Sequence, residues 1–221
     1  MISVFDVETS FQLNDEGKKD PSAKNPDNFL VSLGINEEYI FFKHRDYKGI
    51  PNRKIIQDIL DKTTLLVGHN IKFDLLWLWE AGFKYDGRVC DTMLVEYIFN
   101  RGIKRSLSLK DCCAFRGVIQ KSDLTESYLK NNISFENIPI DIVEEYGRLD
   151  VKATRSLFDA QMSQLKKPQH KHLIKTIQNM CQFVVVLTKM EDNGIYIDRN
   201  LFIKLKLNNA LYVGVRELFK K

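Results

Sequence analysis

The chain of 221 residues has little cysteine or histidine, with four of each. The cysteines (Cys90, Cys112, Cys113 and Cys181) show no C-x-x-C spacing and have no paired histidines nearby. This argues against a zinc site or a disulfide framework and is typical of a reducing cytosol. No apolar run approaches the roughly 20 residues of a membrane span. Acids occur as early as Asp6, so the N-terminus does not resemble a signal peptide, and we expect a cytoplasmic protein that binds no membrane.

Positive charge is concentrated at one end of the chain. Residues 199–221 hold six basic side chains and one acidic side chain, a net charge of +5, whereas the whole chain carries +4. Such a tail would attract a polyanion. The solvated face of a helix has the same composition, so the charge alone does not decide between the two.

Apolar patterning predicts strands early in the chain and helices late. Strands are expected at the first residues, with a loop from 10 to 28, and then at 29–35, 39–45 and 64–70, the middle two as a hairpin. Helices are expected at 52–62, 71–81, 91–99, 107–115, 140–165, 170–192 and 199–219. This order predicts an α/β protein, a mixed sheet flanked by helices.

Two carboxylates interrupt the first strand. Asp6 and Glu8 are two residues apart, so their side chains point to the same face. A solvated edge strand explains such a pair, and so does a bound divalent cation that removes the repulsion between the carboxylates.

A third acid lies at a predicted strand-to-helix turn. Asn70 is a suitable N-cap residue for the helix that follows, and Asp74 lies one turn into that helix among apolar residues. A carboxylate in such surroundings is costly unless it is paired or bound to a metal. Its interaction with the positive end of the helix is the alternative explanation.

A fourth acid shares a helix face with a tyrosine. Tyr146 and Asp150 are four residues apart on the apolar stripe of the helix predicted at 140–165. A hydrogen bond between them would satisfy the carboxylate, and a metal ion would do so equally well.

Together these patterns resemble the DnaQ-like 3′–5′ exonucleases in their tyrosine-bearing (DEDDy) branch. The matching residues are Asp6, Glu8, Asp74, Tyr146 and Asp150. The histidine branch would need a histidine at position 145, where this chain has Glu145. The resemblance implies a ribonuclease H-like fold.

The resemblance is closer to the proofreading domain of family A DNA polymerases, through the segments GHNIKFD, CDTMLVEYI and LTKMEDNGIYID. It implies an exonuclease domain at 1–167 and a helical extension at 168–221 that resembles the start of a polymerase region. The polymerase's own motifs are missing, so the chain is either a stand-alone subunit or a fragment. A strand beginning at Met1 favours the phage type, in a bacterial or phage-infected host cell.

The resemblance also implies a two-metal mechanism with Mg²⁺ or Mn²⁺. Asp6 would bridge both ions, Glu8 and Asp150 would complete the site of the attacking water, Asp74 would support the second ion, and Tyr146 would orient the nucleophile. The expected substrate is the 3′ end of single-stranded DNA, and the expected products are nucleoside 5′-monophosphates. The residues expected to hold the substrate are Thr9, Phe11, His69, Asn70 and Tyr128.

Alternatives to this function are a ribonuclease D-like exoribonuclease and a catalytically silent nucleic-acid-binding module. A DNA polymerase, either separate or continuous with this chain, is the expected partner in replication and proofreading. Residues 170–221 are expected to contribute little to hydrolysis and to strengthen binding or docking. The competing expectation is that the apolar run at 183–187 packs on the exonuclease core.

Overall fold

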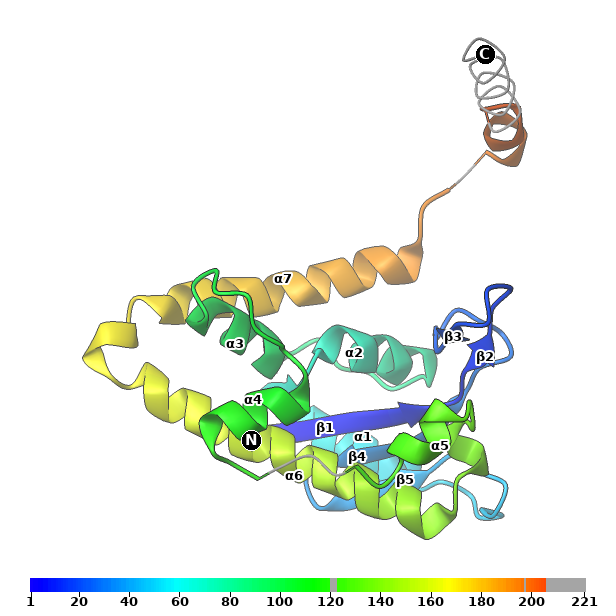
Figure 1. Ribbon diagram of the computed structural model, residues 1–221, viewed down its shortest axis with the longest axis horizontal. Helices are drawn as coiled ribbons and strands as arrows, with labels where there is room; N and C mark the ends of the chain where they lie inside the picture. Colours follow the sequence, from blue (N-terminus) through cyan, green and yellow to red (C-terminus); the bar gives the residue numbers. More distant parts are fainter. Residues whose placement is uncertain (120–122, 197, 206–221) are drawn as a thin grey trace, which may run out of the picture. The chain divides into compact units, whose positions relative to one another are not determined.

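A computed structural model of the chain describes residues 1–119, 123–196 and 198–205 (Figure 1). The elements follow one another in this order: β1 (Ile2–Thr9), β2 (Gln12–Leu13), β3 (Lys19–Asp20), β4 (Leu30–Ile35), β5 (Glu38–Phe41), α1 (Arg53–Lys62), β6 (Leu65–Gly68), α2 (Ile71–Glu80), β7 (Arg88–Asp91), α3 (Thr92–Phe99), α4 (Leu109–Arg116), α5 (Glu126–Lys130), η1 (Phe135–Asn137), α6 (Ile140–Leu165), η2 (Pro168–His170) and α7 (Leu173–Asn193). A further helix begins at residue 199 and is described to residue 205. Among the helices in the described ranges, none combines the length and the apolar character of a membrane span.

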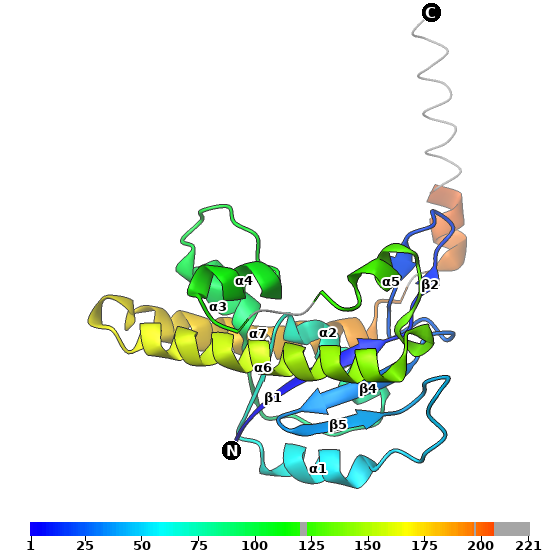
Figure 2. The same cartoon turned by 60° about the horizontal axis from the view of Figure 1, so that its bottom comes forward.

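The main sheet has five strands in the order β5-β4-β1-β6-β7, with β1 at its centre. β1 pairs antiparallel with β4 and parallel with β6, so the sheet is mixed, as predicted. The predicted hairpin is present as β4 and β5, which pair antiparallel across a turn where Asn36 has a φ of 54°. Figure 2 shows α6 along one face of this sheet and α1 on the other. The fold class predicted from the sequence is therefore confirmed.

Two glycines let α6 lie close to the sheet. A Cβ atom added to Gly34 of β4 would come within 2.9 Å of Val151 Cγ2 on α6. One added to Gly147 of α6 would meet the ring of Tyr39, with Cζ at 2.8 Å. Because Gly34 is the register partner of Asp6, this close approach lies beside the acids of β1.

Gly147→Ala is therefore expected to destabilise the protein by about 1–3 kcal/mol, the usual cost of overpacking. The hydroxyl of Tyr39 is hydrogen-bonded to Ser32 Oγ (2.8 Å) and donates to the Val143 carbonyl (3.1 Å). These two hydrogen bonds hold the ring in place, so it cannot move aside without breaking them. Chemical denaturation would measure the change. A gain in stability, the ordinary effect of replacing a glycine inside a helix by alanine, would contradict this packing.

Some elements differ from those expected. The strand β7 was not predicted, because only Val89 and Cys90 of its four residues are apolar. The short pair β2–β3 lies in the stretch expected to be a loop, where Asn14 Oδ1 accepts the Glu16 and Lys18 amides at 3.0 and 2.9 Å. The helix α5 was also missed. The end of the helix expected at 199–219 lies outside the described residues.

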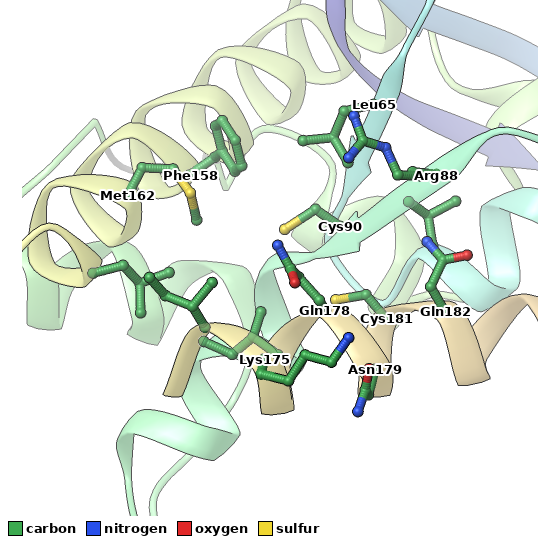
Figure 3. Close-up of a pocket in the computed structure, with 14 residues that line it drawn as sticks. Leu65, Arg88, Cys90, Phe158, Met162, Lys175, Gln178, Asn179, Cys181 and Gln182 are labelled. Atoms are coloured by element: carbon green, nitrogen blue, oxygen red, sulfur yellow. The ribbon is translucent and has the colours of Figure 1, made fainter. Parts of the chain in front are cut away.

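The first part of α7 packs on the core that includes the central strands. Ile177, Cys181 and Val184 are buried and belong to the same apolar cluster as the central strands. By packing, the chain divides into Met1–Thr188 and Lys189–Lys221, so the compact unit extends well past the domain end expected at residue 167. A cavity of about 380 Å³ remains between α7, α6 and β7 (Figure 3). This packing fits the expectation that the apolar run of α7 packs on the core. That residues 1–167 form the functional domain by themselves stays a prediction.

Candidate active site

The central strand presents two carboxylates to α6. Asp6 and Glu8 lie on one face of β1, with Glu8 buried and Asp6 partly exposed. The register of the β1–β4 pair shifts directly after Glu8, which marks the end of the regular ladder at this point. The acids thus stand where β1 leaves the sheet.

The helix α6 adds a third carboxylate to this pair. Asp150 is 2% exposed, and one ligand oxygen from each of Asp6, Glu8 and Asp150 can be chosen so that all three lie within 4.8 Å of one another. Like charges at this separation repel strongly away from bulk water. The cluster therefore needs a cation or bound protons, and carboxylate oxygens are the ligands that Mg²⁺ and Mn²⁺ prefer.

The fourth acid lies against the same strand from α2. Asp74 is 3% exposed, and its Oδ1 accepts the Val7 amide, between the two acids of β1, at 3.2 Å. Burial raises the pKa of Asp74 well above its usual range, and the neighbouring charge of Asp6 raises it further. A cation held beside these groups would favour the ionised form and lower this pKa. The residues present thus fit a divalent metal ion.

Tyr146 stands beside the acids as a neutral phenol. Burial raises the pKa of Tyr146 far above its usual value, and the negative charges of Glu8 and Asp150 raise it further. The Tyr146 side chain also hydrogen-bonds Asp150. The ring of Phe135 lies 5.8 Å from the ring of Tyr146 and helps to fix it. Because the hydroxyl keeps its proton, it can donate a hydrogen bond and orient a reactant, but it cannot serve as a base at neutral pH.

Two grooves adjoin these residues. The first has a volume of about 750 Å³, contains Tyr146 in its wall and is bounded by the start of α2, by α4 and by α5. Its lining residues are His69, Asn70, Met93, Leu107, Ser108, Leu109, Lys110, Asp123, Thr125, Glu126, Leu129 and Tyr146. The other, of about 560 Å³, is lined by Phe11, Gln12 and Leu13 and by residues around η1.

Two of the predicted substrate contacts lie in the first groove. His69 has both ring nitrogens engaged, Nδ1 with Thr92 Oγ1 at 2.9 Å and Nε2 with the Leu107 carbonyl at 2.8 Å. Its ring therefore supports the groove wall. Asn70 is exposed and has a left-handed backbone with a φ of 62°.

Asn70 is the N-cap residue of α2, as expected, but its side chain makes no capping hydrogen bond. The Asn70 and Ile71 amides donate to Asp91 instead, at 3.0 and 3.2 Å. Asp91 was not expected to have a role, although an Asp at the start of a predicted helix is a typical capping signal. The Asp91 carboxylate also accepts the Met93 amide of α3 at 2.9 Å.

The other predicted substrate contacts are placed differently. Thr9 is buried at the end of β1. Phe11 lines the second groove, with its amide donating to Ser134 Oγ at 3.1 Å and the Lys19 ammonium 5.0 Å from its ring centre. Tyr128 packs in an apolar cluster around Phe41. Substrate contacts by these residues stay predictions.

Comparisons with known proteins show the family of the chain. Residues 30–166 match the family described as 3′–5′ exonuclease. The DNA polymerase I of Borreliella burgdorferi is 29% identical over 175 residues, which are 76% of this chain and 19% of that protein. The chain thus spans about a fifth of the length of this relative.

Solved structures share the fold at low identity. The structure "Brucella melitensis NrnC bound to pGG" covers 87% of this chain and 85% of its own, with 18% identity and a TM-score of 0.60. The catalytic core of RRP6 from Trypanosoma brucei covers 83% of this chain and 46% of its own, with 13% identity and a TM-score of 0.52. The family resemblance predicted from the sequence is confirmed.

Proposed function

The chain belongs to the 3′–5′ exonuclease family, and we propose that it removes nucleotides from the 3′ end of single-stranded or frayed DNA, releasing nucleoside 5′-monophosphates. The observation that carries this proposal is the cluster of Asp6, Glu8 and Asp150 beside a groove that contains Tyr146. A catalytically silent module would have no use for such a repulsive cluster.

The acids Asp6, Glu8, Asp74 and Asp150 would hold two Mg²⁺ or Mn²⁺ ions. When bound, such ions lower the pKa of a water molecule and stabilise the charge on the leaving oxygen. The protein holds the four carboxylates in place, the bound ions would favour their ionised form, and the groove would align the terminal phosphodiester. Tyr146 would orient the attacking water through its hydroxyl oxygen, which can accept a hydrogen bond while its proton is donated to Asp150.

DNA is the favoured substrate because the relative that shares 29% identity is a DNA polymerase I. The same relative supports a polymerase, separate or continuous with this chain, as the partner in proofreading. RNA is the second candidate, since structures of similar fold include NrnC bound to pGG and the core of RRP6.

The substrate proposal is tested with DNA and RNA oligonucleotides of one sequence, compared by kcat/KM under Mg²⁺. We expect DNA to be degraded faster. A higher kcat/KM for RNA would favour the second candidate. A pure duplex with blunt ends serves as the control, because only its frayed ends would be cut and its hydrolysis should be slow.

Tyr146→Phe is expected to slow hydrolysis by roughly 10- to 100-fold, because the oriented water is lost while the acids remain. Asp150→Ala should be much slower than Tyr146→Phe, because it removes a carboxylate of the cluster. Single-turnover rates measure both, after circular dichroism has shown that α6 is intact. Equal losses in the two variants would refute this division of roles.

A further inference from the structure

Asp91 is a buried acid at a junction of three elements. It is 2% exposed and is the last residue of β7. Its Oδ1 accepts the Asn70 and Met93 amides, and its Oδ2 accepts the Ile71 amide. The carboxylate thus ties the first turn of α2 to the first turn of α3.

The start of α2 needs such a tie. A left-handed backbone at a residue other than glycine, as at Asn70, is strained and persists only where the surroundings hold it. The backbone amides of Asn70 and Ile71 both donate hydrogen bonds to the Asp91 carboxylate. One helical turn later, Asp74 must reach the Val7 amide between the acids of β1. The place of Asp74 therefore follows from the place where α2 begins.

The helix α7 holds Asp91 from the other side. The Asp91 amide donates to Cys181 Sγ at 3.4 Å. Cys181 also hydrogen-bonds Cys90, the neighbour of Asp91 on β7. Figure 3 shows Cys90 and Cys181 on facing elements at the wall of the cavity between α7 and β7. A series of hydrogen bonds thus leads from α7 through Asp91 to the start of α2.

We propose that Asp91 is a positioning residue for the metal site, whose carboxylate fixes the start of α2 and thereby the carboxylate of Asp74. This inference rests on the proposed function, because Asp91 acts through a residue that would bind the metal. It predicts that Asp91 governs metal affinity as well as stability, in the way that outer partners of metal ligands do.

The variant Asp91→Asn tests this selectively. Its remaining oxygen can still accept the Asn70 and Met93 amides, whereas its amide group would face the Ile71 amide, donor against donor. We expect a folded protein that needs a roughly 10-fold higher Mg²⁺ concentration for half-maximal hydrolysis. We also expect a smaller rise in melting temperature on addition of Mn²⁺, a readout that does not depend on activity.

The matched control is Thr63→Val, which removes a buried hydroxyl near the opposite end of β1. Thr63 Oγ1 donates to the Ile59 carbonyl and bonds Ser3 Oγ, both at 2.7 Å. This variant should lose stability with unchanged metal dependence. If Asp91→Asn shows the wild-type Mg²⁺ requirement and the wild-type rise with Mn²⁺, Asp91 is only structural and the proposal is overturned.

Should Asp91→Asn not fold, Asp91→Ser decides by the same two measurements, because serine can still cap α3 whereas its single hydroxyl oxygen cannot also accept the Asn70 and Ile71 amides. A higher Mg²⁺ requirement supports the proposal, and an unchanged one overturns it. A wild-type protein without any rise on addition of Mn²⁺ would instead refute the proposed function itself, which keeps the two failures distinct.

Discussion

Asp6→Ala is expected to reduce hydrolysis by on the order of 1,000-fold or more, the scale of losing a preorganised electrostatic contact. The metal-free variant should nevertheless be as stable as the wild type or slightly more stable. Asp6 contributes an oxygen to a cluster within 4.8 Å, and its charge helps to raise the pKa of Asp74. Removing it relieves repulsion among buried acids. Single-turnover rates and melting temperatures in EDTA measure the two effects.

The control for this variant is Asp58→Ala, which removes an exposed acid from α1. It should leave the rate and the response to metal unchanged. With Mn²⁺, the wild type and Asp58→Ala should gain stability and Asp6→Ala should gain much less. A metal-free Asp6→Ala protein that melts several degrees below the wild type would argue that Asp6 has a structural role instead.

A chain ending at residue 167 is expected to aggregate or unfold, and with it to lose activity. Ile177 and Val184 are 5% and 7% exposed, and each buried side chain of this kind contributes about 1.5–3 kcal/mol. The truncation would also uncover their partners, including Phe158 and Leu165, in a domain whose whole stability is on the order of 5–15 kcal/mol. Solubility, circular dichroism and kcat of the shortened chain measure the outcome.

A chain ending at Gly194 is the matched comparison, because it keeps all of α7 and removes the basic segment 199–221. We expect unchanged kcat, a higher KM, and a weaker dependence of KM on salt, since several phosphate contacts are lost. A soluble, folded protein ending at residue 167 with wild-type kcat would show that α7 is accessory to catalysis after all.

The acidic cluster was the most predictable part of the molecule, because its members follow local rules. Side chains two apart on a strand share a face, which brings Asp6 and Glu8 together. Side chains four apart on a helix do so as well, which brings Asp150 beside Tyr146. The order of these segments along the chain then indicated the family and, through it, that the segments meet.

The supports of the site could not be predicted, because they depend on contacts between distant segments. The ring of His69 is engaged by Thr92 and by the Leu107 carbonyl, 23 and 38 residues away, whereas its contact with substrate stays a prediction. Asn70 lies at the N-cap of α2 as expected, but the acceptor for the first amides of the helix is Asp91, on a strand with only two apolar residues. Helical spacing showed that α7 has an apolar face, but it did not show which surface that face covers.

Hydrolysis of a 5′-labelled single-stranded DNA under Mg²⁺ tests the proposed chemistry most directly, when the shortened strands and the released nucleotides are both identified. We predict strands that lose one nucleotide at a time from the 3′ end, release of nucleoside 5′-monophosphates, and no reaction in EDTA. An intact strand in the presence of Mg²⁺ or Mn²⁺, release of the label from the 5′ end, or undiminished hydrolysis in EDTA would contradict a metal-dependent 3′–5′ exonuclease built on Asp6, Glu8, Asp74 and Asp150.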